Sequence, residues 1–236
     1  MKKTAMIILT LAMLTACGQE EKKEFYPSGA VSMVAQYRGD KKDGKATEFY
    51  EDGKVKAKLT YKGDQLVGEA ISYYPDGKIE SKINYKAGKK DGETVYYYPN
   101  GNVKETIGFK DGEMDGEDIK YFENGKIEQK NPYKNGKRNG ITYAYYENGE
   151  PQGQIEFKDG KRDGESLWIS KDGVVLEKAF YKDDKLNGDF FIYFDTGELQ
   201  AKGYYKDDLL EGDFFVYDKD GNVVDKDKYY MGRRVF

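Results

Sequence analysis

Residues 61–84, YKGDQLVGEAISYYPDGKIESKIN, decide the fold, because the pattern that they carry returns every 24 residues along nearly the whole chain. The stretch begins with an aromatic residue, Tyr61, continues to a glycine at Gly68, and reaches the glycine of a turn at Gly77. Self-similarity at a fixed period is typical of repeat architectures, in which each copy packs on the next. The sequence therefore predicts an array of tandem repeats.

Three columns keep this spacing through the chain. The aromatic column comprises Tyr37, Tyr61, Tyr85, Phe109, Tyr133, Phe157, Tyr181, Tyr205 and Tyr229. The first glycine column comprises Gly44, Gly68, Gly92, Gly116, Gly140, Gly164, Gly188 and Gly212. The turn glycines are Gly29, Gly53, Gly77, Gly101, Gly125, Gly149, Gly173, Gly197 and Gly221.

Each repeat is predicted to be a β-hairpin. Residues 44–50 and 54–62 have aromatic or β-branched side chains at alternate positions, which indicates two strands. The three residues between them, 51–53, have the chemistry of a type I turn followed by a residue with positive φ, where glycine carries no steric cost. A longer connection, residues 62–68, is expected to lead to the next hairpin.

Simple alternation predicts which side chains share a face of the sheet. It places Thr47 and Phe49 with Val55, Ala57, Leu59 and Tyr61 on one apolar face. It places Lys54, Lys56, Lys58 and Thr60 on the other face, together with one aromatic ring per repeat.

Short connections imply neighbouring antiparallel strands. The predicted fold is therefore all-β, an elongated single-layer meandering antiparallel sheet of about 17 strands. Residues 25–36 carry half a repeat, residues 37–228 carry eight full repeats, and residues 229–236 carry a truncated ninth.

The N-terminus has the features of a signal peptide. Lys2 and Lys3 precede an apolar run over residues 5–14, which is too short for a membrane span of roughly 20 residues. The following Leu14-Thr15-Ala16-Cys17 resembles the lipobox of bacterial lipoproteins. This resemblance implies that residues 1–16 are removed, that Cys17 carries a diacyl anchor, and that residues 17–24 are a polar tether. The alternative is an ordinary secreted protein with a chance cysteine.

Location and charge limit the partners. Gly18 follows the cysteine, so outer-membrane sorting is expected if the host has two membranes. Loss of Lys2 and Lys3 takes the formal charge from −4 to −6, which disfavours nucleic acid as a partner.

The chain has no histidine and a single cysteine, which excludes Ser-His-Asp, Cys-His and thiol redox machinery. Its carboxylates recur at turn positions, so no catalytic residue, metal or cofactor is expected.

The pattern Y-K-G-D-x-x-x-G-E-x-x-x-Y-Y-x-D-G-K resembles the MORN-repeat family, most closely its bacterial variant form, which is often described as an antitoxin component. The resemblance covers residues 25–236 and implies β-hairpin repeats used for protein association, membrane-proximal scaffolding or lipid contact. Two departures stand out. The common form has Gly-x-Gly where this chain has Gly68-Glu69 or Gly188-Asp189, and an exported lipoprotein would lie across a membrane from an intracellular toxin.

Departures from the repeat mark the candidate binding residues. Asn131-Pro132, Pro151 and Gly153 replace strand residues, and a local bend or bulge is expected there. The only tryptophan, Trp168, either anchors a partner or packs over its neighbours. The last two repeats are apolar on both predicted faces, so this end either covers itself or docks on a partner. The partner-binding candidates are Tyr74, Tyr98, Phe122, Tyr146, Trp168, Phe190, Ile192, Phe194, Phe214 and Val216.

These observations predict a non-enzymatic, membrane-anchored repeat lipoprotein that acts as a protein-binding scaffold at the cell envelope. Two alternatives stay open: a module that contacts glycans or lipids through Tyr74, Tyr98 and Phe122, and an antitoxin-like neutralising binder. Homo-oligomerisation also stays open.

Overall fold

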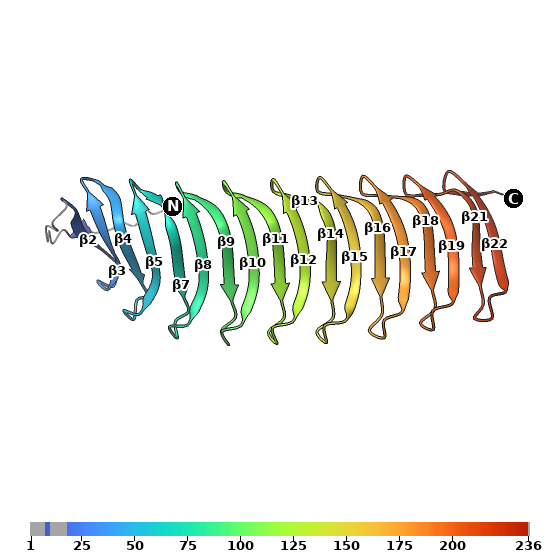
Figure 1. Ribbon diagram of the computed structural model, residues 1–236, viewed down its shortest axis with the longest axis horizontal. Coiled ribbons are helices and arrows are strands. Elements are labelled where there is room, and N and C mark those ends of the chain that lie inside the picture. Colours follow the sequence, from blue (N-terminus) through green and yellow to red (C-terminus); the bar gives the residue numbers. More distant parts are fainter. Residues whose placement is uncertain (1–7, 10–17, 236) are drawn as a thin grey trace. The chain divides into compact units, whose positions relative to one another are not determined.

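The computed structural model describes residues 8–9 and 18–235, and it confirms an all-β chain whose described part contains strands and turns but no helix. Contacts divide the chain into two compact units, residues 1–114 and 115–236. Each unit is a meandering antiparallel sheet in which successive strands are neighbours (Figure 1).

The strands of the first unit follow one another in chain order. They are β1 (Ile8–Leu9), β2 (Glu20–Phe25), β3 (Val31–Arg38), β4 (Lys41–Phe49), β5 (Val55–Lys62), β6 (Gln65–Leu66), β7 (Gly68–Tyr73), β8 (Ile79–Lys86), β9 (Lys89–Tyr97) and β10 (Val103–Lys110).

The second unit begins within β11 and repeats the same hairpin to the end of the chain. Its strands are β11 (Glu113–Tyr121), β12 (Ile127–Lys134), β13 (Lys137–Arg138), β14 (Gly140–Tyr145), β15 (Pro151–Lys158), β16 (Lys161–Ile169), β17 (Val175–Lys182), β18 (Lys185–Tyr193), β19 (Leu199–Lys206), β20 (Leu209–Leu210), β21 (Gly212–Tyr217), β22 (Val223–Tyr230) and β23 (Arg233–Val235).

The prediction that residues 17–24 form a polar tether is wrong for most of these residues. Residues 20–25 form β2, which pairs with β3 from Glu20↔Tyr37 to Phe25↔Val31. Glu24 is buried, accepts a hydrogen bond from the Tyr37 hydroxyl at 3.1 Å, and lies 3.2 Å from the Lys42 ammonium. This polar segment is therefore a strand of the sheet, and its Glu24 carboxylate pairs with Lys42 on β4. The predicted lipidation site, Cys17, lies outside the described residues.

The predicted three-residue loop is confirmed. The Gly53 N–H donates to the Tyr50 carbonyl at 2.9 Å, and the Tyr50 N–H donates to the Lys54 carbonyl at 2.8 Å. Gly53 has φ of 82°, the left-handed value that this loop requires.

The other connection is much shorter than expected. Gly63 and Asp64, both with positive φ, form a two-residue turn, and Lys62 pairs at once with Gln65. This geometry is that of a type I′ turn, which glycine and aspartate accept. The column that includes Gly44 therefore marks an irregularity inside a strand, and the predicted strand start at residue 44 is wrong because β4 begins at Lys41.

A β-bulge beside every three-residue loop changes the predicted faces. Phe49 pairs with Val55, but Glu48 pairs with Ala57 and Ala46 pairs with Leu59, so one residue of β5 has no partner on β4. An extra residue on one strand reverses the parity of everything beyond it. Ala57 and Leu59 therefore share a face with Ala46 and Glu48, and the predicted grouping of Ala57 with Thr47 is wrong.

The buried face of each sheet carries small side chains in its central columns. In the first unit, Ala35 and Ala46 are 2% and 3% exposed, and Met33, Tyr37, Leu59 and Tyr61 pack around them. In the second unit, the corresponding buried positions include Asn131, Thr142, Ala179 and Ala201. Small central residues let the longer flanking side chains close over them, which is how a single layer obtains a core.

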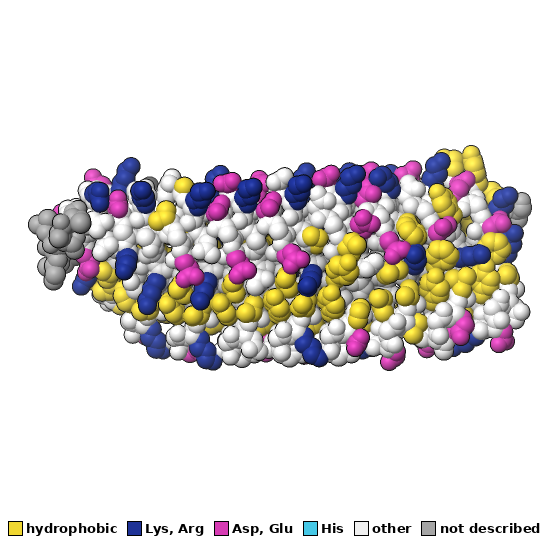
Figure 2. Space-filling view, viewed as in Figure 1, with side chains coloured by type: hydrophobic (Ala, Val, Ile, Leu, Met, Phe, Trp, Pro, Cys, Tyr) yellow, Lys and Arg dark blue, Asp and Glu magenta, His cyan; other side chains and the backbone are white. Residues whose placement is uncertain are grey.

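Apolar pairs adjoin the three-residue loops on the opposite face, for example Phe49↔Val55, Tyr73↔Ile79 and Tyr193↔Leu199. Figure 2 shows hydrophobic side chains gathered along this part of each unit, while lysines and carboxylates line the edge that holds the two-residue turns. That charged edge is also bonded between repeats. The Asp64 carboxylate accepts the Lys42 N–H at 2.8 Å, and Lys161 pairs with Asp183 at 3.1 Å.

Candidate functional site

The prediction that one aromatic ring per repeat shares a face with the lysines is wrong: these rings, among them Tyr74, Tyr98, Phe122 and Tyr146, lie on the buried face, and we call them the ring stripe. The Tyr74 hydroxyl donates to the Tyr97 carbonyl at 2.6 Å, and the Tyr146 hydroxyl donates to the Ile169 carbonyl at 2.7 Å. Burial raises the pKa of the Tyr74 phenol, and the nearby carboxylates Glu80 and Asp76 raise it further. These hydroxyls therefore stabilise the contact between hairpins.

Tyr98 and Phe122 occupy the same place at the start of their loops and are half-buried. The Lys104 ammonium lies 5.8 Å from the Tyr98 ring centroid, and Lys171 lies 5.8 Å from that of Tyr146. Phe194 has Lys219 at 5.5 Å in the same arrangement. The stripe is thus built into the fold and covered in part by lysine side chains.

The phenylalanines of the last two repeats are half-buried because their neighbours are small. Phe190 pairs with Gly203 on one side and with Ala179, which is fully buried, on the other. A Cβ atom added to Gly203 would lie 2.6 Å from the Phe214 ring. Phe190 and Phe214 also make edge-to-face contacts with Tyr205 and Tyr229, with centroids 5.4 and 6.5 Å apart. Ile192 and Val216 lie beside them, opposite Ala201.

The exposed apolar side chains of this end are different residues, which sequence reasoning missed. Leu209, Tyr230 and Met231 lie at the edge with the two-residue turns, and they are 44%, 62% and 62% exposed. Val223 and Val224 begin β22 and are 52% and 61% exposed. Tyr204 and Val235 are exposed as well. We call these seven residues the C-terminal apolar residues.

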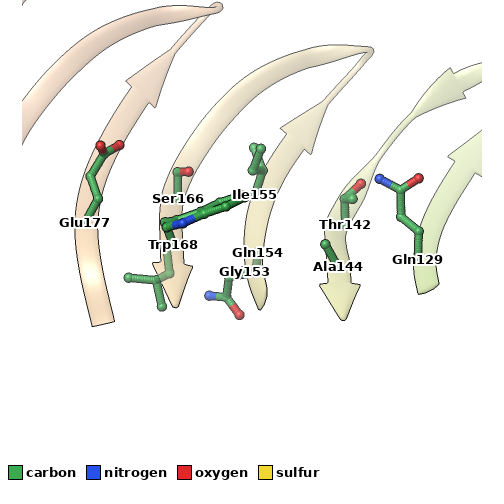
Figure 3. A pocket seen from close by; sticks show the side chains of 10 residues that line it. Gln129, Thr142, Ala144, Gly153, Gln154, Ile155, Ser166, Trp168 and Glu177 are labelled. Carbon is green, nitrogen blue, oxygen red and sulfur yellow. The ribbon is translucent and has the colours of Figure 1, made fainter. Parts of the chain in front are cut away.

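A groove of about 490 Å³ crosses the buried face of the second unit from β12 to β17. Ala144 and Gly153 provide little side-chain bulk in its floor, and Trp168, Gln129 and Glu177 rise around them (Figure 3). The indole of Trp168 reaches from β16 toward Ile155 on β15 (Figure 3). Trp168 is 49% exposed and is the one aromatic side chain among the described residues that line the groove.

The backbone explains the gap in the floor. Gly153 pairs directly with Trp168, and an added Cβ at Gly153 would lie 2.5 Å from the Leu167 carbonyl oxygen. The sequence marked both residues as departures from the repeat, and the structure brings them together. Pro132 and Pro151 lie within β12 and β15, and the bulge beside Tyr145 has the same position as those of the other described hairpins, so the predicted special bend is absent there.

A buried polar cluster around Asn131 adjoins the groove, and the equivalents of Asn131 in several other repeats are apolar, for example Leu59, Ile83 and Ile107. The Asn131 amide N–H2 donates to Asp118 Oδ2 and to Gln129 Oε1, both at 3.2 Å, and the Thr142 hydroxyl donates to Asn131 Oδ1 at 3.3 Å. Asn131 and Asp118 are 0% and 4% exposed. Asp118 Oδ1 has no hydrogen-bond partner among the described residues. Sequence reasoning noted Asn131 but missed Asp118.

The repeats match a known protein family. The sequence profile of the MORN repeat variant matches seven consecutive segments, residues 42–62, 66–87, 90–111, 114–135, 138–159, 162–183 and 186–207. The chain belongs to this family. Its MORN repeats are consistent with a repeat protein that binds partners. The same hairpin continues through β21 and β22, beyond the last matched segment.

Other comparisons add no functional information. Curated proteins give no significant match. A chain of the Photorhabdus luminescens Tc holotoxin pore is 14% identical, with a TM-score of 0.20 over 94% of this chain and 13% of that chain. A porin-like protein from Bacteroides uniformis is 8% identical, with a TM-score of 0.21 over 97% of this chain and 91% of that chain. Likenesses this weak carry no argument about fold or function.

The described residues contain no group of three or more His, Cys, Asp or Glu side chains placed to hold a metal ion. They also contain no helix with the length and apolar character needed to cross a membrane.

Proposed function

We propose that this MORN-repeat protein is a non-enzymatic scaffold that binds a partner protein at the cell envelope. The observation that carries the proposal is the exposure of the C-terminal apolar residues. Leu209 adjoins the turn formed by Met231 and Gly232, since a Cβ added at Gly232 would lie 3.0 Å from the Leu209 side chain. Exposed apolar side chains that adjoin one another are typical of an interaction site, whereas single scattered residues need no explanation. The described part of the first unit has no large hydrophobic side chain of comparable exposure.

Anchoring through a lipid on Cys17 is part of the same proposal. It rests on the signal-peptide pattern of residues 1–16 and on the position of the only cysteine directly after Leu14-Thr15-Ala16. A lipid at Cys17 would hold the repeats close to the membrane surface, at the outer membrane in a host with two membranes. Incorporation of a labelled acyl chain tests it. Cys17→Ala should abolish the label, and persistence of the label in that variant would refute anchoring at this residue.

The non-enzymatic assignment is supported by the contacts of Glu24 and Asp118, the two carboxylates that are buried in the described part of the chain. Glu24 interacts with Tyr37 and Lys42, and Asp118 interacts with Asn131. Acid–base hydrolysis of a glycoside requires two carboxyl groups facing one reaction centre. Each buried carboxylate instead belongs to a separate local cluster inside its own unit.

Site-specific photo-crosslinking in cells tests partner binding. A photoreactive residue at Val224 or Met231 should give one adduct of defined mass, because both side chains are exposed at the proposed surface. The same residue at Glu69, an exposed polar position on β7, serves as the control. Equal labelling from Glu69 and Val224, or no adduct from Val224 and Met231, would contradict the proposal. An adduct of twice the protomer mass would identify a second copy as the partner.

A further inference from the structure

We propose that the groove around Trp168 binds a lysine or arginine side chain of the partner protein. This inference rests on the proposed protein-binding function and names the chemistry of one contact. Cation–ring contacts are frequent within this chain. Aromatic rings in many repeats have a cation above them, with Lys22 4.9 Å from the Tyr37 centroid and Lys90 4.8 Å from that of Phe109.

Trp168 is one of the described rings that have no such cation. None of the cation–ring contacts among the described residues involves its indole, although tryptophan offers the best face for a cation. The residue three repeats earlier, Tyr96, is contacted by a cation, because Lys90 Nζ lies 3.3 Å from its hydroxyl and 6.0 Å from its ring centroid.

The side chain equivalent to Lys90 is held elsewhere in the Trp168 repeat. Arg162 lies 4.1 Å from the Tyr181 ring centroid and donates to the Asp184 carbonyl at 2.8 Å. The Asp184 carboxylate also accepts the Arg162 backbone N–H at 2.9 Å. These contacts hold Arg162 at the edge of the two-residue turns, so no internal cation covers the indole.

Charge on the groove favours an external cation. Glu177 pairs directly with Trp168 across β16 and β17, and its carboxylate makes no ion pair among the described residues. No lysine or arginine is among the described residues that line the groove. An ammonium or guanidinium group entering beside the indole would therefore meet an unpaired carboxylate and no like charge.

Polar groups and shape fit a side chain presented by an extended peptide. The Gln129 amide N–H2 and the Ser166 hydroxyl have no partner among the described residues and line the groove. They can bond the peptide backbone on either side of the cation. The groove crosses five strands, which corresponds to about 19 Å at about 4.8 Å per strand, so it accommodates several residues of extended chain.

Fluorescence anisotropy with the purified full chain tests this site. The probes are a fluorescein-labelled hexapeptide with two lysines, the same peptide with both lysines acetylated, and an uncharged cello-oligosaccharide as competitor. We expect the lysine peptide to bind at least about tenfold more tightly than the acetylated peptide, because acetylation removes the charge. Salt should weaken the binding, since Glu177 lies at an open groove.

Matched variants locate the binding. Trp168→Ala and Glu177→Gln should each lower the affinity for the lysine peptide about fivefold to tenfold. Tyr143→Ala, an exposed aromatic on the opposite face of the same unit, and Glu69→Gln should leave it unchanged. Equal binding of the acetylated peptide, displacement by the oligosaccharide, or full affinity in Trp168→Ala would overturn the inference. If Val224 still gives a crosslinked partner in that case, the scaffold function stands and only this contact fails.

Discussion

Replacing Asn131 by isoleucine, alone and together with Asp118→Ala, tests how the buried polar cluster contributes to stability. The double variant restores the apolar pair that Ala70 and Ile83 form at the same register in β7 and β8. In the wild type, Asn131 donates to the Asp118 carboxylate at 3.2 Å with both side chains at most 4% exposed. Asn131→Ile alone leaves this carboxylate buried without a donor and should lower the free energy of unfolding by about 3 kcal/mol.

Asp118→Ala alone should raise the free energy of unfolding by about 1 kcal/mol, because Asp118 Oδ1 has no hydrogen-bond partner in the described part of the chain and Asn131 keeps its bonds to Gln129 and Thr142. The double variant should also exceed the wild type by about 1 kcal/mol, since a well-packed apolar pair replaces a buried polar one. Independent effects would instead make the double variant about 2 kcal/mol less stable than the wild type, so we expect a coupling of about 3 kcal/mol.

Urea unfolding followed by tryptophan fluorescence measures these differences. Trp168 is the only tryptophan and lies in the same compact unit as Asp118 and Asn131. Coincidence with circular dichroism must be checked, because repeat arrays can unfold in steps. Additivity of the two single variants within about 0.5 kcal/mol would refute the argument that the carboxylate depends on Asn131.

Three further predictions concern the repeat itself. Gly44→Ala should lower the free energy of unfolding by about 1–2 kcal/mol more than Gly53→Ala does, as measured by chemical denaturation. A Cβ at Gly44, where φ is 126°, would have Gln36 atoms within 2.9 Å, whereas a Cβ at Gly53, where φ is 82°, would meet open space. Equal losses in the two variants would contradict this prediction. Tyr74→Phe should cost about 1 kcal/mol through loss of the bond to the Tyr97 carbonyl, and an unchanged melting temperature would show that water replaces it. Burial and the Glu24 hydrogen bond raise the pKa of Tyr37 to about 12 from 10.0, so folding favours the protonated phenol and stability should fall as pH rises from 10 to 12. Tyr37→Phe should reduce this fall in urea titrations at stepped pH, and an identical slope in both proteins would refute the assignment.

The repeat architecture could be read from the sequence because it depends on local chemistry. Glycine at the third loop position, as in Gly53, supplies a left-handed residue that other side chains rarely adopt, and this requirement recurs in every hairpin. The family and the hairpin unit follow from the same columns. The Lys62–Gly68 connection was misjudged because Gly63-Asp64 alone makes the turn, and a strand can continue through a bulge glycine.

The candidate site was accessible to the sequence only as separate unusual residues. Trp168, Gly153 and Asn131 each depart from their column, and this signal drew attention to them. Asp118 could have been found in the same way, since the residues one and two repeats before it are Thr94 and Ala70. That Gly153 faces Trp168, and that Glu177 faces it from the other side, depends on pairing between strands.

By itself the sequence determined the period, the hairpin, the three-residue loop and the all-β class, because turn geometry and alternation act over a few neighbouring residues. Only the tertiary structure decided which side chains share a face. One unpaired residue beside each loop, such as the one between Val55 and Ala57, reverses the side of every later residue in its strand. The ring stripe therefore lies with the buried alanines, and the groove at Trp168 forms where two small residues, Ala144 and Gly153, meet on that face.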